Sequence, residues 1–278
     1  QSINSNEDSN KETIYASFYP IYNLTKQIAG DKFNVKSFTN LNTEVHDFEP
    51  SAKDMADLSK AKVLFLSGAD LESWKDKVEK ASKIEMVDTS KGIDLIKTED
   101  EEDHDHEHED SQEDEHEDSE KEEDHDHEDG EEEHHHHHGL YDPHVWLSPK
   151  NGIIQAKNIA DKLSEIDPEN KDYYMGNSYL ARDYGLEQIP LTSITSTNEA
   201  DAKTMKDAID YVKKEKISAI FYEKGGSDKN VKTLANELSL DAKAINTIEY
   251  ASDDDLKNEK TYQEMIKENL ELMESSLK

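Results

Sequence analysis

The sequence contains no cysteine, which excludes disulfide bonds and thiolate ligands, so any bound metal must be held by nitrogen and oxygen. No apolar run approaches the roughly eighteen residues that a membrane-spanning helix needs. The chain opens on the polar stretch QSINSNEDSNKE, without an initiator methionine or an apolar signal segment. This opening suggests a processed or truncated start, and residues 1–12 are expected to form a flexible leader.

Acidic residues are abundant, but they are unevenly distributed. Residues 99–133 hold 24 Asp and Glu against one Lys, which gives −23 of the formal net charge of −34 and leaves −11 for the rest. A field of this sign repels nucleic acid and anionic lipid headgroups, and it concentrates cations around the chain. Cations are therefore the expected partners, and nucleic acid is not.

Residues 99–139 form an acidic insert that holds eleven of the thirteen histidines. The insert has too little apolar surface to offset the entropy lost on ordering, so it is expected to be a disordered loop. Its histidines are His104, His106, His108, His116, His125, His127, His134, His135, His136, His137 and His138.

Outside the insert, short apolar runs alternate with amphipathic segments, which is typical of an α/β fold with mostly parallel sheets. Strands are predicted at 13–18, 32–39, 62–68 and 84–90, with helices at 19–30, 49–61 and 69–81. A long helix is predicted at 147–167 after the insert. A second α/β run follows, with strands at 186–192, 217–223 and 242–248 and helices at 201–214, 228–240 and 260–277.

The two remaining histidines lie in loops at the ends of predicted elements. His46 stands in TEVHDFEPS, before a helix whose N-cap is expected at Ser51, and His144 stands in YDPHVWLSP, after the insert. Loops of this kind present ligand groups in α/β proteins. A single histidine is usually a hydrogen-bonded surface or core residue, but two in matching loops beside a histidine-rich insert indicate a metal site. Imidazole suits Zn²⁺ well and Mn²⁺ or Ni²⁺ less well.

Three stretches, TEVHDFEPS, DPHVWLSP with NIADKLSEIDPENKDYY, and YLARDYGLEQIP, resemble the metal-binding subunits of bacterial ABC importers. These are the cluster A-I solute-binding proteins, and the resemblance is to their zinc-binding branch, from about Thr13 to the C-terminus. It implies an α/β fold of two lobes, each a mostly parallel sheet flanked by helices, joined by a long rigid helix, with the metal in the cleft between them. Residues 13–148 would be the N-terminal lobe, 149–185 a shortened linking helical segment and 186–278 the C-terminal lobe.

The resemblance also implies the ligands. His46 and His144 match the first-lobe ligands, and Glu249 in INTIEY matches the acidic ligand of the second lobe, with an ordinary exposed carboxylate as the alternative. Glu223, at the end of AIFYE, is expected to support the site or the closing of the lobes. With ligands on both lobes, closing the cleft would complete the coordination shell, and opening it would release the ion.

The sequence departs from the family at one place. The family has a third histidine in the pattern His-x-x-Phe-x-Tyr-Leu-Ala, whereas this chain has Tyr174 at the histidine position and Asn177 at the phenylalanine position. The departure predicts that a segment with one strand is missing here, either naturally or by removal from this chain, in agreement with the three predicted strands of the second lobe against four in the first. The site would keep three protein ligands, and water or an insert histidine would complete it.

These features predict a monomeric, extracytoplasmic protein, at the cell surface or in the periplasm, that captures Zn²⁺ and delivers it to an ABC permease. A lipid anchor would need a residue outside this chain. The insert is expected to collect zinc in weak, fast-exchanging sites beside the tight one, with an acidic spacer or an internal affinity tag as alternatives.

Three other functions compete with this prediction. They are a manganese-type subunit of the same fold, a metal-buffering surface protein, and a hydrolase with an open zinc site. The hydrolase is disfavoured because the sequence has no HExxH, G-x-S-x-G or P-loop pattern, so the protein is not expected to be an enzyme.

Overall fold

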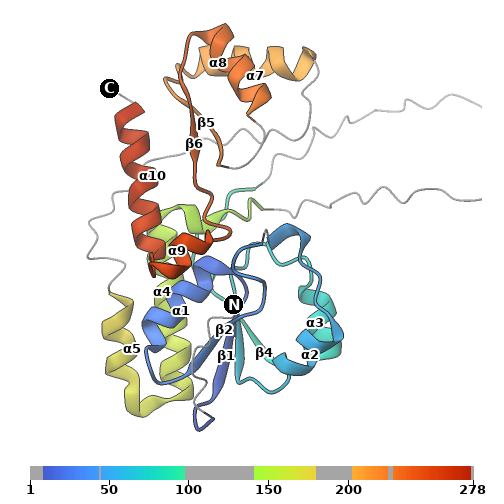
Figure 1. The fold of residues 1–278 in the computed structure, drawn as a ribbon, viewed down its shortest axis with the longest axis vertical. Helices are drawn as coiled ribbons and strands as arrows, with labels where there is room; N and C mark the ends of the chain where they lie inside the picture. Colours follow the sequence, from blue (N-terminus) through green and yellow to red (C-terminus); the bar gives the residue numbers. More distant parts are fainter. Residues whose placement is uncertain (1–8, 44, 98–140, 180–201, 225–227, 277–278) are drawn as a thin grey trace, which may run out of the picture.

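The structure, a computed structural model, describes residues 9–43, 45–97, 141–179, 202–224 and 228–276. Its larger sheet has four parallel strands in the order β2-β1-β3-β4 (Figure 1). The strands are β1 (Thr13–Ala16), β2 (Asn34–Ser37), β3 (Val63–Leu66) and β4 (Glu85–Asp88). Each strand lies inside a predicted strand segment, which confirms the α/β prediction for this part of the chain.

Helices cover both faces of this sheet. They are α1 (Tyr19–Ala29) and α4 (Pro149–Ile166) on one face, and α2 (Ala52–Leu58) and α3 (Lys75–Ala81) on the other (Figure 1). In β3, Val63 and Phe65 join the buried cluster below α1 and α4, whereas Leu64 and Leu66 join the cluster below α2 and α3. Successive side chains of a strand point to opposite faces, so a strand buried on both sides reads as a continuous apolar run. We call this sheet and its helices the first unit.

The ends of α1 and α2 follow from local sequence. Gly30 ends α1 with φ +55° and ψ −126°, a backbone conformation that residues with a Cβ rarely adopt, so glycine is favoured there. At α2 the Ser51 side chain accepts the Asp54 N–H (3.1 Å) and the Asp54 carboxylate accepts the Ser51 N–H (2.8 Å). This capping box confirms the predicted N-cap and fixes where the preceding loop must end.

The helix predicted over residues 69–81 begins only at Lys75, so that prediction is wrong in its first half. Ala69 and Asp70 have φ angles of 53° and 63°, which a right-handed helix does not allow. The buried carboxylate of Glu72 accepts hydrogen bonds from the backbone N–H groups of the two residues that follow β3. These bonds hold the chain in a turn where the apolar spacing predicts a helix.

α4 matches the long helix predicted at 147–167, whereas the role of this helix in linking the lobes stays a prediction. α4 ends at Ile166, and Asp167 leaves the helical region with φ −132° and ψ 78° because the residue before a proline, here Pro168, is disfavoured in a helix. The short turn η3 (Pro168–Asn170) and α5 (Lys171–Ser178) follow, and α5 packs back against α4 and α1. The connection to the second lobe and the strand predicted at 186–192 lie outside the described residues.

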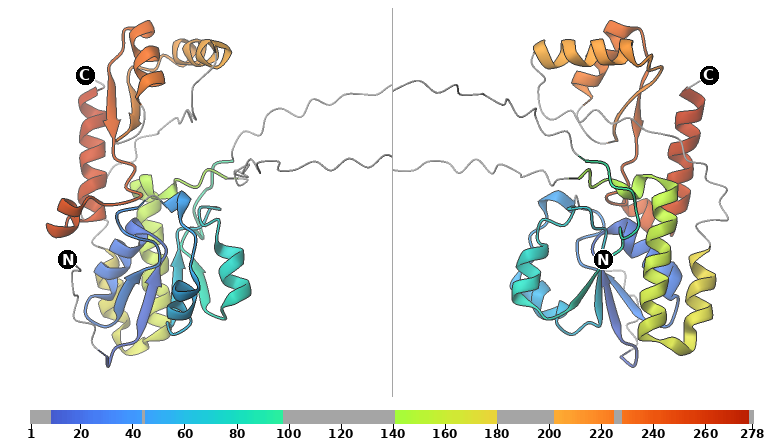
Figure 2. Two further views of the ribbon diagram at one scale, coloured as in Figure 1. Left: turned by 45° about the vertical axis from the view of Figure 1, so that its right-hand side comes forward. Right: turned by 180° about the vertical axis from the view of Figure 1, so that it is seen from behind.

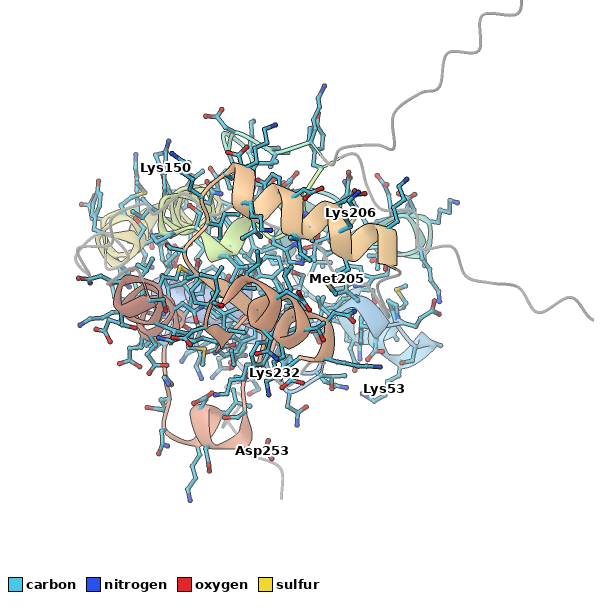
Figure 3. The ribbon with its side chains drawn as sticks, turned by 90° about the horizontal axis from the view of Figure 1, so that it is seen from above. Lys53, Lys150, Met205, Lys206, Lys232 and Asp253 are labelled. Carbon is cyan, nitrogen blue, oxygen red and sulfur yellow. The ribbon has the colours of Figure 1, made fainter. Side chains whose placement is uncertain are left out.

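A second unit consists of α7 (Ala202–Lys214), β5 (Ile220–Glu223), α8 (Lys229–Leu238) and β6 (Ala242–Ile245). β5 and β6 form a two-stranded parallel sheet. All four elements match predicted segments. Figure 2 shows this unit above the first one, and Figure 3 shows α7 and α8 on its outer side with the exposed Lys206 and Lys232. Its buried apolar side chains, within the described residues, are Val212, Leu234 and Ala235.

The C-terminal helices, α9 (Asp253–Lys257) and α10 (Tyr262–Ser276), return to the first unit. Tyr262, Met265 and Ile266 belong to the buried cluster that also contains α1 and α4 side chains. The lobe boundary at residue 186 stays a prediction, but part of the predicted C-terminal lobe contributes to the core of the first unit. Among the described helices, none has the length and apolar character needed to cross a membrane.

Candidate metal centre

His46 lies on η1 (Val45–Asp47), the short turn between β2 and α2. Val45 is buried in the core, and its carbonyl accepts the Phe48 N–H (3.3 Å), which closes the turn. The capping box at Ser51 then fixes the start of α2, so the turn is held at both ends. The His46 side chain is 41% exposed and therefore accessible from solvent.

His144 directly precedes η2 (Val145–Leu147), and Asp142 holds it in place. The Asp142 Oδ1 accepts hydrogen bonds from the backbone N–H of His144 (3.0 Å) and from its ring Nδ1 (2.8 Å). The hydrogen bond from the His144 ring lowers the pKa of the Asp142 carboxyl group, so this group stays ionised and can only accept. Nδ1 therefore carries the proton, which leaves the Nε2 lone pair for a cation.

Glu249 lies in the loop after β6, and this loop is attached to the first unit on both sides of the carboxylate. Trp146 Nε1 donates to the Thr247 carbonyl (2.7 Å), and the Ala251 N–H donates to the Leu41 carbonyl (2.9 Å). Trp146 follows His144 closely in the chain, and Leu41 lies between β2 and η1. The loops that carry the two histidines thus also hold the loop that carries the carboxylate.

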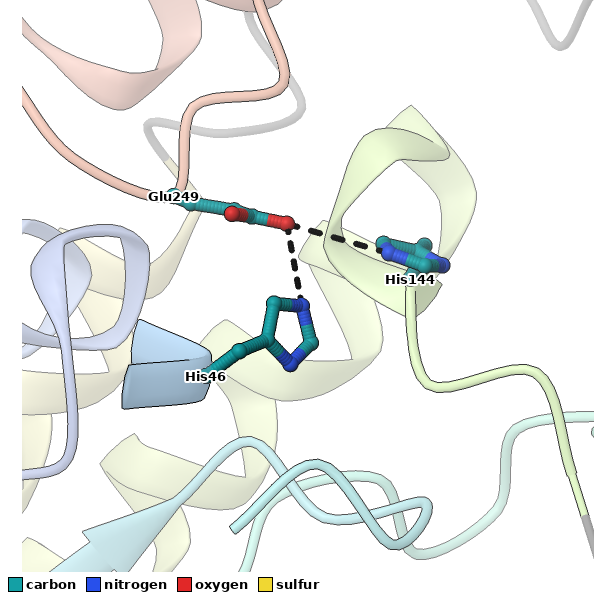
Figure 4. Close-up of side chains that lie close together, drawn as sticks. All are labelled: His46, His144 and Glu249. Atoms are coloured by element: carbon teal, nitrogen blue, oxygen red, sulfur yellow. Dashed lines mark ion pairs between the residues drawn. The ribbon is translucent and has the colours of Figure 1, made fainter. Parts of the chain in front are cut away.

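The three side chains converge, as Figure 4 shows. Oε1 of Glu249 lies 3.4 Å from Nε2 of His46 and 3.7 Å from Nε2 of His144, and all three ligand atoms lie within 4.8 Å of one another. Ligands about 2.0–2.2 Å from a tetrahedral Zn²⁺ are roughly 3.3–3.6 Å apart. Both distances exceed ordinary hydrogen-bond lengths and lie within the range of an ion pair. The three groups therefore face a common point.

The burial of the three groups is unequal. Glu249 is 4% exposed and His144 is 34% exposed, so the site opens to solvent on the histidine side. The Oε2 atom of Glu249 has no hydrogen-bond partner within the described residues. A buried carboxylate is costly unless it is paired. Two neutral imidazoles and one carboxylate carry a single negative charge, which a divalent cation would compensate.

The other residues singled out by sequence lie apart from this set or outside the described residues. Glu223 ends β5, is exposed, and accepts a hydrogen bond from Thr247 Oγ1 (3.2 Å). It therefore contacts the loop of Glu249 and not the converging atoms, and its supporting role stays a prediction. The eleven histidines of the insert lie outside the described residues.

Tyr174, at the position of the family's third histidine, lies at the opposite end of α4 from His144. It is fully buried on α5, and its hydroxyl donates to the Asp167 carboxylate (2.5 Å), just beyond the C-terminal end of α4. The 18-residue α4 is about 27 Å long. Tyr174 thus packs the α4–α5 pair, and the converging set in the described part of the chain has three members.

Sequence reasoning missed two residues that shape the site. Asp142 was visible in the DPH stretch, where an Asp two residues before a His is placed to hold the backbone and ring of that His. Trp146 contacts Thr247 across 101 residues of sequence. No local pattern reveals such a contact.

Comparison with known proteins agrees with the fold. The solved structure of the Zn(II)-bound ZnuA-like domain of Streptococcus pneumoniae AdcA matches with a TM-score of 0.63 at 25% identity, covering 96% of this chain and 98% of that domain. The fold is thus that of the metal-binding solute-binding proteins. A family model described as "ZnuA: Zinc-uptake complex component A periplasmic" matches residues 14–178 and 176–276, and the chain belongs to this family.

Two relatives have similar sequences over nearly the whole chain. The high-affinity zinc uptake system protein ZnuA of Bacillus subtilis is 30% identical over 301 residues, covering 95% of this chain and 87% of that protein. The zinc-binding lipoprotein AdcA of Streptococcus pneumoniae is 29% identical over 307 residues, covering 98% of this chain, which spans 57% of AdcA. The two segments matched by the family model meet at residues 176–178, next to the departure at Tyr174 and Asn177.

Proposed function

We propose that this chain is the solute-binding component of a zinc-uptake system, which captures Zn²⁺ with His46, His144 and Glu249 and delivers it to an ABC permease. The observation that carries the proposal is the convergence of three ligand atoms within 4.8 Å of one another at a solvent-open site. The family and its relatives, described as zinc-uptake and zinc-binding proteins, support it. The chain acts as a monomeric carrier outside the cytoplasm, without catalysis and without nucleic acid.

The residue types favour zinc over other divalent ions. Two imidazoles and one carboxylate form a mixed nitrogen and oxygen set, whereas Mg²⁺ and Mn²⁺ prefer more oxygen ligands. Water fits the fourth position, because the histidine side of the site is exposed. The alternative is a manganese-type subunit of the same fold. Competition between Zn²⁺ and Mn²⁺ for the metal-free protein distinguishes the two.

The insert and the anchor complete the proposal. The eleven histidines of residues 99–139 form weak collecting sites tethered beside the tight one, which raises the local zinc concentration. A lipid anchor would hold the protein at the cell surface, and the description of the relative AdcA as a lipoprotein supports this part of the proposal.

Zinc titration of a chain that lacks residues 99–139 tests the site. We expect one tight Zn²⁺ per chain by calorimetry. His46→Ala, His144→Ala and Glu249→Gln should each weaken binding by more than the roughly 10- to 100-fold that loss of an outer partner costs. The exposed Glu169→Gln serves as the matched control for Glu249→Gln and should leave the affinity unchanged.

Three results would contradict the proposal. Wild-type affinity in the His46→Ala or Glu249→Gln variant would show that the ion binds elsewhere. Preference for Mn²⁺ over Zn²⁺ in competition would favour the manganese-type alternative. Turnover of an ester, peptide or phosphoester by the zinc-loaded protein would make it a hydrolase.

A further inference from the structure

The residue before Glu249 has an unusual backbone conformation. Ile248 has φ +61° and is 0% exposed. A β-branched residue rarely adopts this left-handed conformation, because its side chain crowds the backbone there. A conformation of this kind is strained and persists only where the surrounding structure imposes it. In this loop it sets the direction in which the next residue, Glu249, leaves the chain.

A chain of hydrogen bonds from α10 imposes this conformation. The Asn246 Oδ1 accepts the Ile248 N–H (2.9 Å). Asn246 is in turn held by Asn269 of α10, whose Oδ1 accepts the Asn246 N–H (3.1 Å) and whose Nδ2 donates to the Asn246 carbonyl (2.6 Å). Both polar atoms of the Asn269 side chain are thus used on a single residue, three positions before Glu249.

Apolar side chains other than Asn269 pack α10 against the first unit. Tyr262, Met265 and Ile266 already anchor this helix in the core of the first unit. Asn269 itself is only 6% exposed, and a buried amide adds stability only when its hydrogen bonds are satisfied. An apolar residue at this position would serve packing equally well, whereas only a donor and acceptor pair can hold both backbone groups of Asn246.

We propose that Asn269 is a positioning residue for zinc capture: through Asn246 and Ile248 it aims the Glu249 carboxylate at the two histidines. This inference rests on the proposed function. Asn269 lies 20 positions after Glu249 in the sequence and does not belong to the converging set. It acts on the ion only through the carboxylate.

Two substitutions on α10 separate positioning from packing. Asn269→Leu removes both hydrogen bonds to Asn246 and keeps the number and branching of the side-chain heavy atoms. Gln263→Leu is the matched control, because Gln263 is 2% exposed on the same helix and bonds Gln27 of α1 (2.9 and 3.0 Å), away from Glu249. Zinc affinity is measured on the full chain by competition with a chromophoric chelator below one equivalent of zinc, so that the tightest site is read.

We expect Asn269→Leu to weaken zinc binding about tenfold or more, in the range known for outer partners of metal ligands. Gln263→Leu should stay within about twofold of the wild-type affinity, because its contacts do not reach the loop of Glu249. Should Asn269→Leu not fold, Asn269→Asp keeps the acceptor for the Asn246 N–H, loses the donor, and should also bind zinc more weakly. Wild-type affinity in the folded Asn269 variant overturns the inference.

A double variant tests whether Asn269 acts through the carboxylate. Asn269→Leu should add little to the loss already caused by Glu249→Gln, and Co²⁺ bound to either single variant should show the same change in its visible absorption bands. If Asn269→Leu lowers the zinc affinity as much in the Glu249→Gln variant as in the wild type, Asn269 does not act through the carboxylate and the inference fails. If Glu249→Gln alone binds zinc like the wild type, the proposed site itself is wrong.

Discussion

Glu72 is a buried carboxyl group outside the metal site, with 6% of its surface exposed at the turn after β3. Burial raises the pKa of its carboxyl group from 4.5 to about 7, although backbone hydrogen bonds from Ser67 and Gly68 act in the opposite direction. Between these two pH values the folded protein keeps a proton on Glu72 that the unfolded chain has released. Raising the pH through this window therefore favours unfolding.

Glu72→Gln should remove this pH dependence. In the wild type, the contribution of Glu72 to the free energy of unfolding should fall by up to about 3 kcal/mol as the pH rises from about 4.5 to 7, at 1.36 kcal/mol per pKa unit. The amide does not titrate, so the stability difference between the variant and the wild type should grow with pH and level off above pH 7. Urea unfolding of the metal-free proteins at several pH values measures this difference in the free energy of unfolding. A constant difference would contradict the prediction.

Tyr174 stands at the histidine position of the family's pattern, yet it contacts Asp167 at the far end of α4. Tyr174→Phe removes one hydrogen bond to a carboxylate that also accepts one from the Asn170 side chain (2.7 Å). We expect a loss of about 1–2 kcal/mol in the free energy of unfolding and an unchanged zinc affinity. Urea unfolding and chelator competition check the two parts, and weaker zinc binding would connect Tyr174 to the site.

At the scale of the elements, the sequence predicted the helices and strands whose position depends on interactions between residues close together in the chain. The apolar runs of β1 and β3 and the capping box of α2 are such cases. The start of α3 was missed because the bonds to Glu72 replace the first helical turn. The end of α4 at Ile166 agrees with the helix predicted at 147–167, because the residue before Pro168 is disfavoured in a helix.

The site was predictable to a similar degree. His46 and His144 stood out from their loops, whereas Glu249 was assigned by resemblance to the family. The contacts that bring the three together join residues far apart in sequence, as Trp146 and Thr247 show. Such contacts depend on how the elements pack and leave no local pattern.

The strands of the two units differ in how well they are enclosed. β1 and β3 are central strands with buried side chains on both faces, whereas the side chains of β5 and β6 are half-buried or exposed. A two-stranded sheet is marginally stable without further packing. Backbone amides of β5 and β6 should therefore exchange with deuterium on the order of 100-fold faster than those of β1 and β3. Equal protection would indicate that residues beyond the described ones complete the second unit.

At the scale of the whole molecule, the insert can be deleted without separating the segments that flank it. Lys97 and Tyr141 form an isolated antiparallel bridge, and the Asp142 N–H donates to the Ile96 carbonyl (2.7 Å). The Cα atoms of Lys97 and Tyr141, which flank the insert, are therefore about 5 Å apart. Replacing residues 99–139 by two glycines leaves a turn of about four residues, which is long enough to close an antiparallel pair. The converging ligands and the hydrogen bonds that hold them come from residues before Lys97 or after Tyr141, so the deletion leaves them in place.

Calorimetric zinc titration should then separate capture from collection. The shortened chain should bind one Zn²⁺ as tightly as the full chain, and the additional weak binding should vanish. In the full chain this weak binding should also fade below about pH 6, because histidine with a pKa near 6.5 becomes protonated. A full-length variant with the eleven insert histidines changed to Asn keeps the acidic charge and isolates their contribution. Loss of the tight site on deletion would show that the insert supplies a ligand, and loss of nearly all zinc binding would identify a buffering protein instead of an uptake component.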